Sequence, residues 1–234
     1  LKDKPYKLFN ADFTKIESFE KAFDGVEMVI HSAGMTAGRN LQDFMKGNRD
    51  ATEVLLNAAQ RFAPNLKRFV HISSQAACGP SSSLDKPTTE DSECRPITSY
   101  GISKLESEKT VLQYTDRLPV TIARPPAVYG QRDSEILTFF QAVNRGLAPL
   151  IGFDDKRVSL VHVLDLARGV IEAGLSDHTI GKPYFISSEE FYSWKTVSNT
   201  AGKALGKSLL LPIHLPHWIV FAIAGVNGLI GKML

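Results

Sequence analysis

Three short apolar runs, separated by helical patterns, constrain the fold of this chain more than any other feature. Residues 26–33, 68–74 and 120–125 each predict one strand, and residues 41–62 and 100–117 place apolar side chains at helical spacing. The run at 26–33 is almost continuously apolar, which predicts a strand buried on both faces. Strands that alternate with helices predict an α/β fold, with a parallel sheet and helices on both faces.

Weaker patterns predict the remaining elements. Alternating residues at 6–11 predict a short strand, residues 14–23 a helix, and the Pro-, Ser- and Thr-rich stretch 79–96 a loop. After Gly130 we expect a helix, a strand, a helix, a strand and a helix, at residues 134–145, 157–162, 163–174, 182–187 and 191–205.

Composition limits what such a fold can do. The 234 residues are 43% hydrophobic and 22% charged, as in a globular domain, and the net charge is only +2. Without a clustered basic run, nucleic acid is not an expected partner. The two cysteines, Cys78 and Cys94, indicate neither a disulfide framework nor a metal site, and Cys78 is interpreted as a small packed residue. The expected location is cytoplasmic.

The last stretch, residues 217–232, is strongly apolar but is interrupted by Asn227 and by glycines. Its uninterrupted part is shorter than the ~18–20 residues that a membrane span requires. We expect a helix that packs on the body of the protein, with peripheral membrane contact through this segment as the alternative.

Tyr100 and Lys104 stand four residues apart in the helix predicted over 100–117. Positions i and i+4 share a helix face, so the ammonium group can lie beside the phenol. A nearby cation favours the phenolate and lowers the pKa of a tyrosine below its usual value of about 10. Such a tyrosine can exchange a proton with an alcohol or carbonyl oxygen. The same spacing also occurs on ordinary surface helices, so the other features decide between the two interpretations.

Three further groups of residues follow predicted strands, where open α/β sheets bind ligands. The small residues that end at Gly34 allow a ligand to approach the backbone closely, whereas His31 is expected to be packed and hydrogen-bonded. The hydroxyl of Ser74 can bond a substrate oxygen, and Pro125 begins a stiff two-proline turn. Each group alone also fits an ordinary turn or strand end.

The ordered set of motifs is far more specific than any one of them. Ser-x-x-x-x-Gly from Ser74, Tyr-x-x-x-Lys from Tyr100 and Arg-Pro-x-x-Val-Tyr-Gly from Arg124 resemble the extended branch of the short-chain dehydrogenase/reductase superfamily, the NAD-dependent epimerase/dehydratase family. The resemblance covers about residues 12–205. It implies a Rossmann-like α/β fold that is incomplete at its N-terminal side, with a small C-terminal substrate-binding lobe. A homodimer formed through the helices at 41–62 and 100–117 is a further implication.

The resemblance also implies roles for individual residues. Tyr100 is the expected catalytic acid/base, Lys104 bonds the nicotinamide ribose, and Ser74 holds the substrate oxygen. Asn48 lies behind the site, where a proton relay is conceivable. The residues implied to bind NAD or NADP are Tyr100 and Lys104 together with Asp12, Phe13, Ser32, Ala33, Gly34, Pro125 and Val128. Those implied to bind substrate are Met35, Gln75, Arg157 and His162. No metal is implied.

One part of the family pattern is missing. Extended members begin with a strand and a glycine-rich turn that binds pyrophosphate, and no such stretch occurs here. We therefore expect these residues to be part of a longer polypeptide, or residues before Leu1 to have been omitted. The choice between NAD and NADP cannot be predicted without them. The expected domains are a partial dinucleotide-binding domain at 1–130 and a mainly substrate-binding lobe at 131–234, with 157–175 returning to the core.

The function implied is that of an NAD(P)-dependent oxidoreductase that transfers hydride between nicotinamide and a carbonyl or alcohol. Ala127 stands where members that act on nucleotide-diphosphate sugars often carry Asn, and the Arg124–Pro125 pair resembles 3β-hydroxysteroid dehydrogenases and dihydroflavonol reductases. A small apolar substrate is therefore favoured. The alternatives are a nucleotide-sugar epimerase or dehydratase with bound NAD, and a dinucleotide-binding or interaction protein without catalysis.

Overall fold

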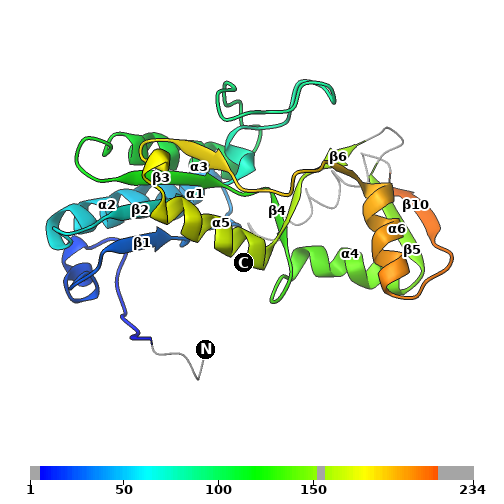
Figure 1. Cartoon of the computed structure of the whole chain (residues 1–234), viewed down its shortest axis with the longest axis horizontal. Helices are drawn as coiled ribbons and strands as arrows, with labels where there is room; N and C mark the ends of the chain where they lie inside the picture. The colour runs from blue at the N-terminus through cyan, green and yellow to red at the C-terminus, as the bar shows by residue number, and fades with distance from the viewer. Residues whose placement is uncertain (1–5, 152–155, 216–234) are drawn as a thin grey trace. The chain divides into compact units, whose positions relative to one another are not determined.

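The computed structural model describes residues 6–151 and 156–215, which form two compact units (Figure 1). Unit 1 contains the described residues up to 80 together with 88–124 and 170–184. Unit 2 contains residues 81–87, 125–169 and the described residues from 185 onward. Each unit has its own strands and helices and is described by itself.

Unit 1 is built on a four-stranded sheet in the order β1-β2-β3-β8. Its strands are β1 (Met28–His31), β2 (Arg68–Ile72), β3 (Val120–Arg124) and β8 (Pro183–Phe185). The first three run parallel, with His31 opposite His71 and His71 opposite Ile122. Because parallel strands end at the same edge, the segments that follow β1, β2 and β3 emerge on one side of the sheet.

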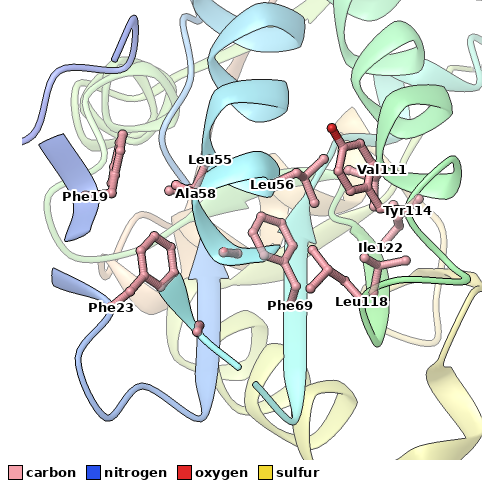
Figure 2. Packing of buried hydrophobic residues seen from close by; sticks show 13 residues of the cluster. Phe19, Phe23, Leu55, Leu56, Ala58, Phe69, Val111, Tyr114, Leu118 and Ile122 are labelled. Carbon is pink, nitrogen blue, oxygen red and sulfur yellow. The ribbon is translucent and has the colours of Figure 1, made fainter. Parts of the chain in front are cut away.

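Several helical segments cover one face of this sheet. They are η1 (Ile16–Ala22), α1 (Leu41–Phe44), η2 (Met45–Asp50), α2 (Ala51–Phe62) and α3 (Ser99–Leu112). Figure 2 shows Phe69 and Ile122 of the sheet packed with Leu56 of α2 and with Val111 and Tyr114 beside them. Phe69, Ile122, Leu56 and Val111 are fully buried, so this cluster is the main core of unit 1.

The other face of the sheet is covered by the end of α5 (Val163–Leu175). A Cβ built on Gly174 would lie 3.0 Å from the Sδ atom of Met28 and 3.3 Å from a methyl group of Val70. The helix therefore lies directly on β1 and β2, and a larger residue at position 174 would force the helix away from them. The structure confirms the predicted α/β fold with helices on both faces of a parallel sheet.

Unit 2 contains two helices and three two-stranded sheets. The parallel pairs are β4 (Ala127–Tyr129) with β7 (Leu160–His162), and β5 (Leu147–Ile151) with β10 (Leu211–Leu215). The antiparallel pair is β6 (Arg157–Val158) with β9 (Tyr192–Ser193). The helices that lie wholly in unit 2 are α4 (Glu135–Asn144) and α6 (Trp194–Ala204), and short helical turns elsewhere are η3 (Gln75–Ala77) and η4 (Asp177–Thr179).

Three predictions about local structure are wrong. Residues 6–11 form no strand, since no described strand pairs with them. The strand at 26–33 is not buried on both faces, because β1 pairs only with β2 among the described strands and leaves Ile30 43% exposed. The single strand expected at 157–162 is two short strands, β6 and β7, which pair with different partners. In each case the pairing partner, which a local pattern does not contain, determined the outcome.

The helix predicted at 41–62 is continuous in sequence but contains a π-helical segment, η2. The predicted loop at 79–96 is confirmed, with one isolated bridge between Ser83 and Lys86. The apolar stretch 217–232 lies outside the described residues. Among the residues that are described, none belongs to a helix long and apolar enough to cross a membrane.

Candidate functional site

Helix α3 begins with a capped turn that carries Tyr100. The side chain of Thr98 accepts a hydrogen bond from the backbone N–H of Gly101 at 3.0 Å, which satisfies one of the free donors at the helix start. The Tyr100 ring lies half-buried, edge-on to Phe44 with ring centroids 6.2 Å apart. Lys104 follows one turn later on the same face of the helix. The predicted helix and its Tyr–Lys spacing are therefore confirmed as local structure.

Lys104 is buried at the end of β2. Its side chain is only 5% exposed, and its Nζ atom donates a hydrogen bond to the carbonyl oxygen of Ile72 at 2.7 Å. Burial lowers the pKa of Lys104 from 10.5 to about 8, against an opposing effect of the Glu108 carboxylate. An ammonium group has three N–H donors, and no second acceptor for Lys104 occurs among the described residues. Two donors are thus available for a ligand.

Ser74 comes two residues after Ile72 and caps the short turn η3. Its Oγ atom accepts a hydrogen bond from the backbone N–H of Ala76 at 3.2 Å. A Cβ atom built on Gly101 would collide with the carbonyl oxygen of Ala76, so α3 and η3 are in direct backbone contact near Tyr100. The hydroxyl hydrogen of Ser74 can still donate, because the bond from Ala76 uses the oxygen as acceptor.

Gly34 faces the same region from the end of β1. A Cβ built on Gly34 would lie 2.8 Å from Oδ1 of Asn48 and 3.9 Å from Nζ of Lys104. Gly34 follows β1, Ile72 ends β2, and Lys104 lies near the start of α3. These three segments therefore meet around the Lys104 ammonium group. The structure brings Gly34 close to Lys104 by this measure, and the contact between η3 and α3 joins the two segments that carry Ser74 and Tyr100.

Asn48 ties these segments together. Its side-chain Nδ2 donates to Oγ of Ser103 at 2.8 Å and to the carbonyl oxygen of Met35 at 3.1 Å. Its Oδ1 atom accepts from the backbone N–H of Met35 at 2.7 Å. These three hydrogen bonds, two to Met35 and one to Ser103, join the segment after β1 to α3. Asn48 lies in the π-helical segment η2, a kind of irregularity that often occurs at functional sites.

A buried ion pair supports α3 from below Lys104. Glu108 and Arg124 are 2% and 4% exposed, and the guanidinium donates to both carboxylate oxygens at 3.0 and 2.6 Å. Such a two-point contact is geometrically specific and fixes the helix to the end of β3. Sequence analysis missed this pair. The signal was present, because an arginine that ends a buried strand requires a carboxylate nearby.

Two buried histidines, His31 and His71, lie at neighbouring positions of β1 and β2, with ring centroids 5.4 Å apart and the rings tilted by 40°. His31 is bonded to Oγ1 of Thr52 at 2.9 Å, which confirms the prediction that it is packed and hydrogen-bonded. Burial lowers the pKa of His31 to about 4, with a further contribution from the Lys104 charge. His71 is 1% exposed, and burial places its pKa well below the usual value. Both rings are therefore neutral at pH 7, and His71 escaped sequence analysis because nothing in its strand distinguishes it.

The remaining unit 1 candidates are divided between an open segment and the core. Ser32, Ala33 and Gly34 are exposed after β1. The Asp12 carboxylate accepts from the N–H and the hydroxyl of Thr14, and these hydrogen bonds hold its pKa below the usual value. Phe13 packs partly into the core against Phe19 and stacks on His31 at 6.1 Å. The side chain of Met35 lies against Gly47, and Gln75 is half-buried in η3.

Four candidates belong to unit 2. Pro125 and Val128 lie at β4, Arg157 is exposed on β6, and His162 ends β7. The imidazole of His162 stands edge-on to the Tyr129 ring, with centroids 5.3 Å apart, and lines a cavity of about 510 Å³. The cavity wall is mostly apolar and includes Ile136, Phe140, Leu160, Val161, Tyr192, Trp194, Val197 and Ala201. Its polar positions are Asp165, Ser187, Ser188, Glu189, Thr196 and Thr200.

The unit 1 residues fit the nicotinamide half of a dinucleotide. Exposed small residues after β1 leave room for a flat ligand, and the two available donors of Lys104 suit ribose hydroxyls. The glycine-rich phosphate turn is not among the residues of this chain, so the pyrophosphate has no such turn to bind here. No group of three or more His, Cys, Asp or Glu side chains that could hold a metal occurs in the described part of the chain.

Comparison with known proteins agrees with this fold. The chain is 28% identical over 170 residues to ceramide reductase of Caulobacter vibrioides, covering 73% of this chain and 47% of that protein. Among solved structures, UDP-glucuronic acid 4-epimerase of Bacillus cereus, in complex with UDP-glucuronic acid and NAD, superposes with a TM-score of 0.74. It is 24% identical, and the match covers 88% of this chain and 67% of the epimerase. The structure of RMD from Pseudomonas aeruginosa, complexed with NADPH, gives a TM-score of 0.76 at 22% identity over 88% of this chain and 75% of RMD.

The chain spans about half the length of the curated relatives it matches, with values of 59%, 44% and 47% for three of them. The sequence model of the NAD-dependent epimerase/dehydratase family matches residues 1–186, which is well over half of the chain. The ordered Ser, Tyr–Lys and Arg–Pro motifs and the Rossmann-like sheet point the same way. The chain belongs to the NAD-dependent epimerase/dehydratase family.

Proposed function

We propose that the protein is an NAD(P)-dependent oxidoreductase that interconverts a carbonyl group and an alcohol on a small apolar molecule. The observation that carries the proposal is the environment of Lys104. A cation is buried at the end of β2, one helical turn after Tyr100, with two N–H donors that no described residue uses. Burying a charge is costly, and a purely structural lysine would have its donors satisfied.

Each of three side chains has a distinct task in this proposal. The Lys104 ammonium holds the ribose hydroxyls and favours the phenolate form of Tyr100 through its charge. The Tyr100 hydroxyl gives a proton to the substrate oxygen, or takes one from it. The Ser74 hydroxyl donates a hydrogen bond to the same oxygen and stabilises the charge that develops there. When bound, the nicotinamide supplies or accepts the hydride.

The segments around these side chains maintain their positions. Asn48 bonds both the segment that follows β1 and the helix that carries Tyr100, so it holds these two segments together. The Glu108–Arg124 pair fixes the next turn of α3. Positions held in this way lose little entropy when a ligand binds. Asp12 and Phe13 are proposed to contact the adenine of the cofactor, residues 32–34 its middle, and Pro125 and Val128 its nicotinamide.

The apolar substrate class rests on unit 2. Its cavity of about 510 Å³ is within the range of small-molecule sites, and its wall is dominated by aromatic and aliphatic side chains. Ceramide reductase, a relative by sequence, acts by its name on a lipid. His162 and Arg157 remain proposed substrate contacts, as do Met35 and Gln75 in unit 1.

A second candidate is a nucleotide-sugar epimerase or dehydratase with bound NAD. The exposed Arg157 on β6 favours it, because a guanidinium group can bind a diphosphate by two parallel hydrogen bonds. The structural likeness to UDP-glucuronic acid 4-epimerase shows a common fold and does not by itself identify a sugar substrate. A homodimer remains a prediction that oligomeric-state measurements can test.

The proposal is tested with the full-length native protein and its Lys104→Met variant. NADH and NADPH binding is followed by fluorescence, and reduction is assayed on long-chain ketones, 3-ketosteroids, UDP-sugars and dTDP-sugars. We expect cofactor binding that weakens on substitution and turnover of an apolar ketone. The matched control is Lys109→Met, because Lys109 is exposed on the same helix and, within the described part of the chain, pairs with Glu106 alone.

Three outcomes of this experiment contradict the proposal in different ways. Turnover of a sugar nucleotide alone would support the epimerase or dehydratase candidate. If both lysine substitutions change cofactor affinity equally, Lys104 does not contact the cofactor. Absence of any binding of NADH or NADPH by the full-length protein would favour a non-catalytic interaction protein.

A further inference from the structure

The two cysteines of the sequence, 16 residues apart, lie side by side in the fold. The Sγ atoms of Cys78 and Cys94 are 3.4 Å apart, and both thiols are free. Cys78 is the residue after η3, and Cys94 lies in the segment that leads to α3. Sequence analysis interpreted Cys78 as a packed residue and did not foresee that Cys94 would contact it, because their spacing contains no motif.

The backbones around the two thiols are already in contact. The N–H of Arg95 donates to the carbonyl oxygen of Cys78 at 2.8 Å. A Cβ atom built on Gly79 would collide with the carbonyl oxygen of Arg95, so the two segments cannot approach more closely at that point. A disulfide requires sulfurs about 2 Å apart. The two Sγ atoms, 3.4 Å apart, must therefore approach each other by roughly an ångström for the bond to form.

The two thiols have different surroundings. Cys94 is half-buried, and the Nη2 atom of Arg124 donates to its sulfur at 3.5 Å. The thiolate is the reactive form of a cysteine, and access to solvent decides which of two neighbouring thiols an oxidant meets first. Cys78 is 2% exposed, and burial raises the pKa of its thiol to about 12. Cys94 is therefore the thiol that reacts with an oxidant first. Cys78 is placed to react with the oxidised Cys94 and to form a disulfide.

We propose that Cys78 and Cys94 form a reversible, peroxide-sensitive dithiol site. In the first step the Cys94 sulfur attacks one oxygen of hydrogen peroxide, the O–O bond breaks, and Cys94 sulfenic acid and water are formed. In the second step the Cys78 sulfur attacks the sulfur of Cys94, hydroxide leaves, and the thiol proton converts it to a second water. The two thiols are oxidised by two electrons, and one peroxide is reduced to two waters.

The site lies in the stretch of chain between Ser74 and Tyr100. A disulfide would join the end of η3, which Ser74 caps, to the segment that enters α3 just before Thr98 and Tyr100. It would also replace the Cys94 thiol that Arg124 contacts, while the contact between Arg124 and Glu108 persists. The proposal does not depend on the proposed oxidoreductase activity, since it concerns only the two thiols and their neighbours.

The test treats the reduced full-length protein with hydrogen peroxide and maps its peptides by mass spectrometry. We expect a linked Cys78–Cys94 pair about 2 Da lighter than the two thiol peptides, restored to thiols by dithiothreitol. Because the pKa of Cys78 is raised, the second step is expected to be the slower one at neutral pH. A trap for sulfenic acid, dimedone, should therefore label Cys94 before the link forms.

Two matched variants distinguish the roles of the thiols. Cys78→Ser should accumulate the dimedone adduct on Cys94, whereas Cys94→Ser should leave Cys78 unlabelled under the same conditions. Urea should abolish this difference, because it exposes both thiols equally. Equal labelling of Cys78 and Cys94 in the folded protein would overturn the proposal. So would a link that forms only between two chains, or a folded protein whose thiols both survive peroxide.

Discussion

The two units bury different kinds of side chains. Among the described residues, the buried charged and histidine side chains are His31, Arg68, His71, Lys104, Glu108 and Arg124, and all six lie in unit 1. The buried polar residues of unit 2 are serines, and its main feature is a cavity with an aromatic and aliphatic wall. Buried charge is costly and is maintained where chemistry or specificity requires it, whereas an apolar cavity selects a ligand by shape. The proposed function assigns proton transfer to unit 1 and substrate selection to unit 2, so each assignment can be tested in its own unit.

The largest expected effect comes from removing the proton donor of unit 1. Tyr100→Phe should lower kcat/KM for the ketone by about 10²–10⁴-fold, because the substrate oxygen loses its acid/base partner. Binding of NADH, measured by fluorescence, should change little. The control is Tyr114→Phe, which removes a hydroxyl that bonds Asn57 beyond the end of the same helix. If both variants lose the same activity, the loss reflects a general sensitivity of unit 1 to removal of a tyrosine hydroxyl. The role of Tyr100 as the catalytic acid/base would then be contradicted.

The next effect concerns the stability of unit 1. Glu108→Gln leaves the buried guanidinium of Arg124 without its carboxylate and should lower the free energy of unfolding by about 3–5 kcal/mol. Glu106→Gln on the same helix removes a surface ion pair with Lys109 and should cost at most about 1 kcal/mol. Urea denaturation of both variants measures the difference. Similar values for the two would show that buried charge does not distinguish unit 1.

Unit 2 should respond to a change of cavity volume. Ala201→Phe adds a ring to the α6 wall and should raise KM for an apolar substrate by about 10–100-fold, with kcat changed far less. Lys203→Met on an exposed position of the same helix is the matched control. A fall in kcat with an unchanged KM would contradict the assignment of substrate selection to unit 2, because it would place the cavity in the chemical step.

The smallest effect is a pH dependence of cofactor affinity. The pKa of Lys104 is lowered to about 8, so its ammonium form is present below that pH and is lost above it. NADH affinity should therefore fall by roughly fivefold as pH rises from 7 to 9, since a charged donor makes the stronger hydrogen bond. Lys104→Arg, which stays charged, should show no such fall. If the NADH affinity of the wild-type protein is the same at pH 7 and pH 9, the proposal that Lys104 binds the cofactor is contradicted.

Sequence patterns predicted unit 1 better than unit 2 for a physical reason. The strands at Met28–His31, Arg68–Ile72 and Val120–Arg124 are apolar enough to be recognised locally, and the Tyr100–Lys104 spacing is a property of one helix. The short strands of unit 2 were missed or merged, because β5 pairs with the distant β10 and β6 with β9. Strands of two to five residues carry little periodicity, so their existence depends on partners that are remote in sequence.

The same reason explains what was missed at the site itself. Three contacts join residues that are separate in sequence: the Glu108–Arg124 pair, the tilted His31 and His71 rings, and the Cys78–Cys94 contact. The sequence motifs that point to Ser74, Tyr100 and Lys104 contain no information about these contacts. The predictions of a strand buried on both faces at 26–33 and of a strand at 6–11 were wrong for a similar reason. Both depend on which strands are available to pair, and in the described sheet β1 lies at an edge.

A crystal structure of the full-length protein with bound NADH tests the assignment of unit 1 most directly. The predicted result has the Lys104 Nζ atom within about 2.6–3.2 Å of a ribose hydroxyl, with the Tyr100 and Ser74 hydroxyls facing one substrate oxygen beside the nicotinamide. A cofactor bound elsewhere, with Lys104 still bonded only to Ile72, would contradict it.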